Sequence, residues 1–192
     1  MNFAAVTNIK LPLFLTLLRI VMTLPIILLA LGSSPWMIWA AIVLFIIASI
    51  TDYYDGYYAR KYNQVTNLGK FMDPVADKIL VSSLLILFVF QNKVDIWMVI
   101  LFITRDTLIG GIRAAASADG VIISAQTTGK WKAALQMISI PLILLDLNFG
   151  FIGLESLSAE KIGYFLLWFS VGLSLFSGWQ YIQLYVTQRK EL

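Results

Sequence analysis

Six long apolar runs dominate this chain of 192 residues. Each holds about twenty residues or more, which at a helical rise of about 1.5 Å per residue crosses a bilayer core of about 30 Å. Hydrophobic residues make up 59% of the chain and charged residues 13%, against about 45–50% and about 25% in an average soluble domain. This excludes a soluble enzyme, a disordered chain and a nucleic-acid-binding domain. It predicts an all-α integral membrane bundle of six transmembrane helices at 11–32, 36–58, 72–91, 94–116, 124–147 and 162–186.

Polar residues separate the runs. Gly32-Ser33-Ser34-Pro35 predicts a helix stop followed by an N-cap serine and a proline in the first helical position. Gln91-Asn92-Lys93 predicts a short turn, Asp119-Gly120 a break, and 146–161 the longest linker. The sequence shows no internal repeat and no second domain, so we expect one membrane domain over residues 1–192.

Basic residues are distributed unevenly over the predicted loops and helix ends. Lys93 and Lys161 fall on one side of the membrane and twelve basic residues on the other. Because lysine and arginine concentrate on the cytoplasmic side, both termini are expected in the cytoplasm. A basic cytoplasmic face suits anionic lipid headgroups and phosphorylated substrates. The twelve are Lys10, Arg19, Arg60, Lys61, Lys70, Lys78, Arg105, Arg113, Lys130, Lys132, Arg189 and Lys190.

Histidine and cysteine are both absent from the sequence. This excludes disulfides, thiolate zinc sites, iron–sulfur clusters and a cysteine nucleophile. It also removes the commonest general base and the commonest transition-metal ligand. Any metal is therefore expected to be a hard, oxygen-binding cation such as Mg²⁺ or Mn²⁺.

Four of the eleven acidic residues fall within 26 residues, at the end of the second run and the start of the third. Asp52 and Asp55 are three residues apart and Asp73 and Asp77 four apart, so each pair shares one helix face. The short loop between the runs predicts antiparallel neighbouring helices whose carboxylates converge. Each charge at membrane depth costs about 2.5–3.5 kcal/mol or more. Two divalent cations, Mg²⁺ or Mn²⁺, would balance the four carboxylates and suit a phosphoryl displacement.

Small and basic residues accompany the aspartates. Gly56, Ala59 and Gly69 leave room for a ligand to approach the backbone, and Arg60 has the planar fork that clamps a phosphate.

The pattern Asp52-x2-Asp55-Gly56-x2-Ala59-Arg60-x8-Gly69-x3-Asp73-x3-Asp77 resembles the signature of the CDP-alcohol phosphatidyltransferases. All eight fixed positions match, and the six-span layout agrees. The resemblance implies that Asp52, Asp55, Asp73 and Asp77 ligate metal. It implies that Asp77 is the general base, that Gly56, Ala59, Arg60 and Gly69 hold the cytidine diphosphate part, and that the protein is a homodimer.

The resemblance also implies a reaction. An acceptor hydroxyl attacks the lipid-bearing phosphorus of CDP-diacylglycerol and CMP leaves, which agrees with a metal-assisted displacement that needs no histidine. Because the lipid tails stay in the bilayer, we expect a cell-membrane protein, in bacteria of the inner or plasma membrane, with its active site facing the cytoplasm.

The acceptor is predicted from four more basic residues: Arg105, Arg113, Lys130 and Lys132. Intramembrane cations in excess of partners suggest an anionic ligand. With Leu15-Thr16-Leu17-Leu18-Arg19 they resemble the glycerol-phosphate branch of the family, although Ala133 stands where that branch often has threonine. We therefore expect sn-glycerol 3-phosphate as acceptor and phosphatidylglycerophosphate as product.

Several alternatives stay open from the sequence alone. Inositol phosphate, serine or phosphatidylglycerol would serve as acceptors in the same chemistry. Arg105 either binds a phosphate or only pairs with Asp106. Carboxylates in membrane helices also mark cation transporters, although no inverted repeat supports that function here.

Overall fold

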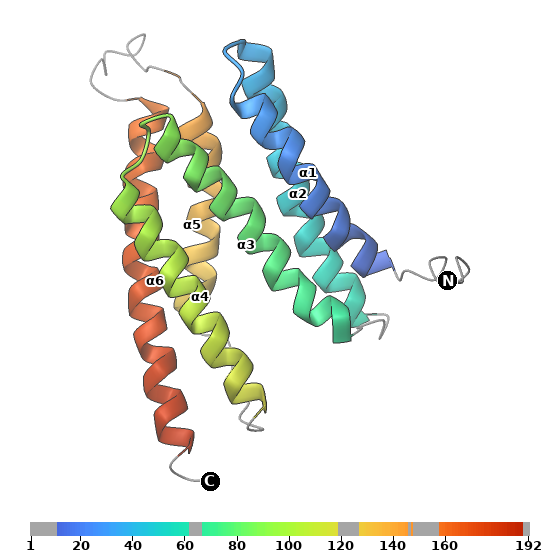
Figure 1. The fold of residues 1–192 in the computed structure, drawn as a ribbon, viewed down its shortest axis with the longest axis vertical. Coiled ribbons are helices and arrows are strands. Elements are labelled where there is room, and N and C mark those ends of the chain that lie inside the picture. The colour runs from blue at the N-terminus through green and yellow to red at the C-terminus, as the bar shows by residue number, and fades with distance from the viewer. Residues whose placement is uncertain (1–10, 62–66, 119–126, 146, 148–157, 190–192) are drawn as a thin grey trace. The chain divides into compact units, whose positions relative to one another are not determined.

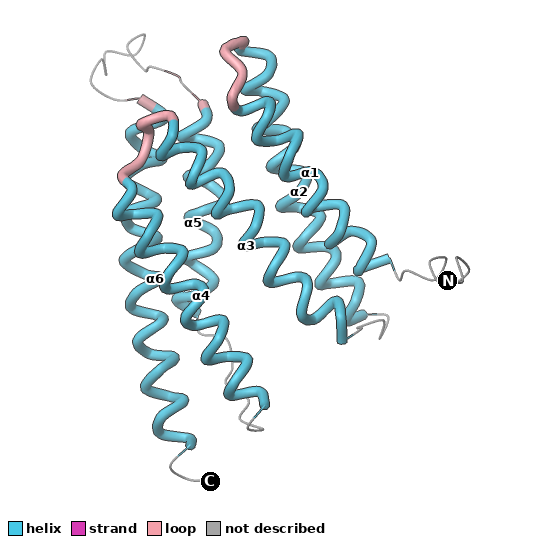
Figure 2. The backbone as a smooth tube through the Cα atoms, viewed as in Figure 1, coloured by secondary structure: helices cyan, strands magenta, loops and turns pink. Residues whose placement is uncertain are grey.

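The computed structural model describes residues 11–61, 67–118, 127–145, 147 and 158–189. This part of the chain folds into six helices and confirms the predicted all-α class (Figures 1 and 2). The helices are α1 (Leu11–Ala30), α2 (Pro35–Lys61), α3 (Asn67–Phe90), α4 (Ile96–Ala118), α5 (Thr127–Leu144) and α6 (Ala159–Arg189).

The helices follow the predicted runs but differ at several ends. α2 continues to Lys61, past the predicted end at 58, and α3 begins at Asn67, five residues before the predicted start at 72. A hydropathy window stops where charges begin, whereas backbone hydrogen bonding carries the helix on through charged residues. The four aspartates lie on helices, as the predicted runs require. The predicted break at Asp119-Gly120 and most of the linker 146–161 lie outside the described residues.

The predicted stop between the first two helices is confirmed. α1 ends at Ala30 and α2 begins with Pro35, whose missing N–H costs nothing in a first turn. The Ser34 carbonyl oxygen accepts from the Met37 N–H at 2.9 Å. A Cβ at Gly32 would meet the end of the Met37 side chain and lie 3.1 Å from the Leu29 carbonyl oxygen, so this turn is a tight one that glycine suits.

The predicted turn at Gln91-Asn92-Lys93 is also confirmed. Asn92 has φ of 57°, in the left-handed region that asparagine tolerates better than most residues. The Lys93 N–H donates to the Phe88 carbonyl oxygen at 2.8 Å and the Asn92 N–H to Val89 at 3.0 Å, which satisfies the end of α3.

The chain divides into two compact units, Met1–Leu84 and Leu85–Leu192. In the first unit α1 packs along α2. The buried face of α1 repeats every three or four residues, as an amphipathic contact requires, while most residues between them face outward. This buried face consists of Thr16, Arg19, Thr23, Ile26 and Ala30.

In the second unit α6 packs against both α5 and α4. A Cβ at Gly163 would lie 2.9 Å from the Ser139 carbonyl oxygen and 2.8 Å from Ile143 Cγ1, so α5 and α6 approach very closely there. Small residues let membrane helices make such contacts. Further along α6, the small residues that are buried are Ser170, Ser174, Ser177 and Gly178.

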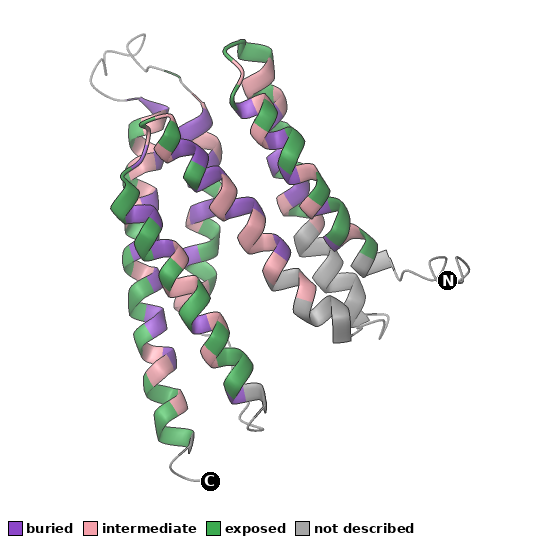
Figure 3. Cartoon of the chain, viewed as in Figure 1, coloured by how far each residue is buried: buried purple, intermediate pink, exposed green. Residues whose placement is uncertain are grey.

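Large apolar side chains are also exposed on the helices, and buried and exposed residues alternate along their described parts (Figure 3). On α6 alone Phe165, Phe169 and Trp179 are at least 60% exposed. Water-facing surfaces rarely carry patches of this kind, whereas lipid-facing surfaces do. Among the described residues, Ala159–Gln188 is long and apolar enough to span a membrane, and Phe14–Ala30 and Pro35–Thr51 are shorter apolar helices.

Candidate active site

The four aspartates lie on two helices that are consecutive in the chain. Asp52 and Asp55 belong to the C-terminal part of α2, and Asp73 and Asp77 to the N-terminal part of α3. Figure 1 shows these helices running in opposite directions, as a helical hairpin requires. Continuous helix through each pair bears out the premise that its two members, three or four residues apart, share a face.

Only one of these aspartates has a described side chain. Asp77 is partly buried. The side chains of the other predicted donor-site residues lie outside the described part, so their predicted contacts stay predictions. They are Asp52, Asp55, Gly56, Ala59, Arg60, Gly69 and Asp73.

The donor set fits hard divalent cations by its chemistry. Four carboxylates supply oxygen ligands, and a sequence without histidine or cysteine offers neither imidazole nor thiolate. Among the side chains that the structure describes, no group of three or more acidic residues gathers elsewhere as a rival site.

The first unit also buries an arginine. Arg19 of α1 is 2% exposed, and the Thr23 hydroxyl donates to the Arg19 carbonyl oxygen at 3.1 Å one turn later. A cation buried this deeply in an apolar helix requires anionic or carbonyl partners.

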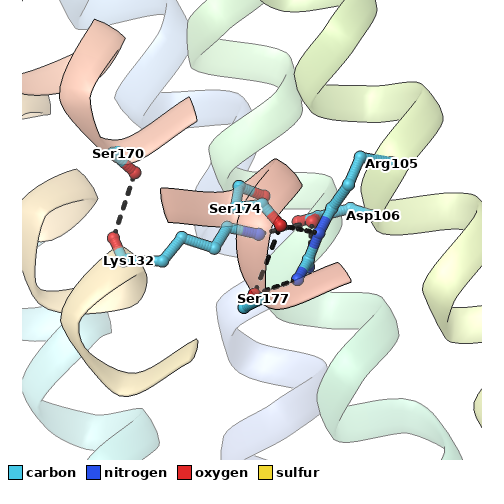
Figure 4. A network of polar contacts seen from close by, with 6 residues as sticks. All are labelled: Arg105, Asp106, Lys132, Ser170, Ser174 and Ser177. Atoms are coloured by element: carbon cyan, nitrogen blue, oxygen red, sulfur yellow. Dashed lines mark hydrogen bonds and ion pairs between the residues drawn. The ribbon is translucent and has the colours of Figure 1, made fainter. Parts of the chain in front are cut away.

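Two of the four predicted acceptor-site cations meet at one carboxylate in the second unit (Figure 4). Asp106 Oδ1 accepts from Arg105 Nη1 at 3.0 Å and also pairs with the Lys132 ammonium. The side chains of Arg105, Asp106 and Lys132 are only 15%, 16% and 9% exposed. The Lys132–Asp106 ion pair thereby joins α5 to α4, and both ion pairs are largely shielded from water.

The Lys132 ammonium has an aromatic neighbour as well. It lies 4.6 Å from the centroid of the Phe102 ring, a favourable cation–π distance. The Lys132 carbonyl oxygen accepts from the Ser170 hydroxyl at 3.2 Å, which ties this turn of α5 to α6. Lys132 is thus held at both its backbone and its side chain.

The other two predicted cations are exposed. Arg113 reaches α6, with its guanidinium carbon 5.5 Å from the centroid of the Tyr181 ring. Lys130 is exposed near the start of α5. Arg105 and Arg113, eight residues apart, both approach α6, so they share a face of α4. Whether the four cations bind a phosphate stays a prediction.

Several residues around these cations were not predicted from the sequence. Serine carries no hydropathy signal, but the short repeat of small residues along α6 is typical of a close helix contact and would have marked that face. The aromatic partners have no such signal, because their contacts join separate helices. The unpredicted residues are Phe102, Ser170, Ser174, Ser177 and Tyr181.

Comparison with known proteins gives a consistent result. The family model for CDP-alcohol phosphatidyltransferase matches residues 9–176. A relative from Bacillus subtilis (strain 168) is 43% identical over 142 residues, covering 74% of this chain and 71% of that protein. A relative from Rickettsia bellii (strain RML369-C) is 35% identical over 174 residues, covering 91% and 94%. Both are named CDP-diacylglycerol--glycerol-3-phosphate 3-phosphatidyltransferase. The resemblance drawn from the aspartate pattern is confirmed, and the chain belongs to the CDP-alcohol phosphatidyltransferase family.

Proposed function

We propose that this protein is a phosphatidylglycerophosphate synthase. It transfers the phosphatidyl group of CDP-diacylglycerol to sn-glycerol 3-phosphate and releases CMP. The observation that carries the proposal is the complete eight-residue pattern from Asp52 to Asp77, lying on two consecutive helices of a chain that belongs to this enzyme family. The names of its relatives support the choice of glycerol 3-phosphate among the possible acceptors.

The donor side of the reaction is assigned to the first unit. Asp52, Asp55, Asp73 and Asp77 would hold two divalent cations, Mg²⁺ or Mn²⁺, in keeping with the divalent metal that the family uses. When bound, such ions neutralise the pyrophosphate of the donor and the charge that develops on the departing CMP. Gly56, Ala59, Arg60 and Gly69 would hold the cytidine diphosphate part, with the arginine fork on a phosphate.

Asp77 has a second role as general base. Its carboxylate would accept the proton of the acceptor hydroxyl as that oxygen attacks the lipid-bearing phosphorus. Asp77 is the one aspartate of the pattern whose side chain the structure describes, and it lies partly buried on α3. The absence of histidine leaves a carboxylate as the natural choice.

The acceptor phosphate is assigned to three basic residues. Arg113, Lys130 and Lys132 would bind the phosphate of glycerol 3-phosphate. Exposure of Arg113 and Lys130 leaves their charged groups accessible to a ligand. Serine and phosphatidylglycerol offer less charge to match these cations.

The same proposal covers the cellular setting. The protein belongs to a membrane enzyme family and has apolar helices, and the distribution of basic residues supports both termini and the active site on the cytoplasmic side. We propose that residues 1–192 work as one catalytic domain in the cell membrane and that two copies form a homodimer.

A CMP-release assay on the purified protein in detergent tests the function. CDP-diacylglycerol and Mg²⁺ are supplied with glycerol 3-phosphate, inositol phosphate, serine or phosphatidylglycerol in separate reactions. Release that depends on glycerol 3-phosphate and exceeds the others at least about tenfold is expected. Preference for another acceptor would contradict the assignment of substrate. Cation uptake by proteoliposomes without CMP release would contradict the enzyme altogether and favour a transporter.

A further inference from the structure

Arg105 is bound to protein groups at all three guanidinium nitrogens. Nε donates to the Ser174 carbonyl oxygen at 2.7 Å, and Nη1 donates to Asp106 Oδ1 at 3.0 Å. Nη2 donates to the Ser177 hydroxyl, which itself donates to the Ser174 carbonyl oxygen at 3.2 Å. Figure 4 shows the guanidinium lying across α6 with these partners around it. The planar fork is therefore fixed in orientation by two helices.

Glycine at position 178 of α6 gives this arrangement its room. A Cβ there would lie 3.1 Å from Arg105 Nε and 3.4 Å from Ile109 Cγ1. Gly178 is buried, so an added methyl group would press on Arg105 and Ile109 rather than face solvent. The close contact between Gly178 and Arg105 is a second observation, independent of the hydrogen bonds, that this guanidinium belongs to the helix packing.

Asp106 transmits this fixed position to Lys132. The same carboxylate oxygen that accepts from Arg105 also pairs with the Lys132 ammonium. Lysine has a long flexible stem and no directional fork, so its position depends on what its ammonium meets. Here it meets the Asp106 carboxylate and the face of the Phe102 ring.

We propose that Arg105 is a positioning residue that does not bind substrate: it fixes Asp106, which holds the Lys132 ammonium for the acceptor phosphate. This inference rests on the proposed function and answers the question that the sequence leaves open about Arg105. Two cations and one carboxylate leave one net positive charge in the cluster. That remaining positive charge would attract an anionic acceptor phosphate. A second protein carboxylate at this place would neutralise the cluster and remove that attraction.

A double-mutant cycle separates positioning from direct binding. Arg105→Gln, Lys132→Met and the double variant are purified in full length, and KM for glycerol 3-phosphate and for CDP-diacylglycerol is measured by CMP release. Each single variant is expected to raise the acceptor KM about tenfold, with the donor KM within about twofold of wild type. If Arg105 acts only through Lys132, the double variant stays within about twofold of Lys132→Met.

Each result of the cycle has a distinct meaning. If the two single effects multiply, the double variant raises the acceptor KM about a hundredfold. Arg105 would then contribute independently of Lys132, which would overturn the positioning role and leave the proposed function standing. Failure of the wild-type protein to release CMP with glycerol 3-phosphate would overturn the proposed function, and this proposal with it.

Conservative variants separate the effect of side-chain geometry from the effect of charge. Arg105→Lys keeps the positive charge but lacks the fork that serves three acceptors, so it is expected to behave like Arg105→Gln. An Arg105→Lys protein with a wild-type acceptor KM would contradict positioning. Asp106→Glu, which retains a carboxylate, is expected to keep much more acceptor affinity than Asp106→Asn.

A milder pair of variants guards against loss of folding. Gly178→Ala retains every charge but pushes on Arg105, and it is expected to raise the acceptor KM about threefold or more without moving the donor KM. Gly172→Ala on the same helix is the matched control, because a Cβ there meets nothing within 4 Å. Equal acceptor KM values for the two variants would contradict the proposal.

Discussion

The guanidinium of Arg113 lies against the ring of Tyr181, with 5.5 Å from its central carbon to the ring centroid. Tyr181 is 4% exposed, whereas Arg113 is exposed. A buried ring from α6 thus supports an accessible cation from α4, and the charge remains available to a ligand. This differs from Arg105, whose nitrogens all donate to protein groups.

Replacing Arg113 by alanine tests whether this accessible cation binds the acceptor. We expect KM for glycerol 3-phosphate to rise about tenfold or more, because a charge-assisted bond to phosphate is lost, while KM for CDP-diacylglycerol changes little. Steady-state CMP release with each substrate varied in turn measures both constants. Equal effects on the two would mean that Arg113 does not bind the acceptor phosphate.

Tyr181 should matter through its ring. Tyr181→Leu removes the aromatic face beneath Arg113 and is expected to raise the acceptor KM about two- to fivefold. Tyr181→Phe keeps the face and serves as the matched control, with an acceptor KM near that of wild type. Equal losses in the two variants would assign the effect to the hydroxyl group and would contradict support by the ring.

Asp77→Asn should remove turnover while sparing the donor site. The variant loses the proposed base, and kcat is expected to fall about a hundredfold or more. Three carboxylates remain for metal, so binding of CDP-diacylglycerol, followed by equilibrium dialysis with radiolabelled lipid in micelles, should be largely retained. Turnover close to that of wild type would refute the role of Asp77.

Gly163 should be important for stability alone. Gly163→Ala places a Cβ against the α5 backbone at Ser139 and is expected to lower the free energy of unfolding by about 1–3 kcal/mol. Gly172→Ala, with open space around residue 172, should be neutral or slightly stabilising, since alanine favours helix. Thermal unfolding in detergent compares the two. A Gly163→Ala protein as stable as its control would show that the α5–α6 contact relaxes freely.

Much of the fold follows from local signals in the sequence. Pro35 and Asn92 mark helix boundaries through backbone properties of single residues, and the structure has boundaries at both. The ends of α2 and α3 around the aspartates were less predictable. Charged residues such as Arg60 and Lys70 lower the hydropathy there without ending the helix.

The candidate site also has some features that the sequence predicts and others that it does not. The aspartate pattern was readable because its spacing lies within one stretch of the chain. The sharing of Asp106 by Arg105 and Lys132 was not readable from the sequence, because Asp106 and Lys132 are 26 residues apart on different helices. The contact of Arg105 with Ser174, 69 residues away, could not be predicted from the sequence either. Such pairings depend on how helices pack, which no single window of sequence encodes.

The central claim is that carboxylates of α2 and α3 bind divalent ions for phosphatidyl transfer. The most direct measurement is CMP release from CDP-diacylglycerol and glycerol 3-phosphate by the purified protein after chelation and after graded return of Mg²⁺ or Mn²⁺. We expect activity to disappear with EDTA and to return with either ion, and Asp52→Asn and Asp73→Asn to need far more metal or stay inactive. Undiminished CMP release in EDTA, or wild-type metal dependence in both variants, would contradict the claim.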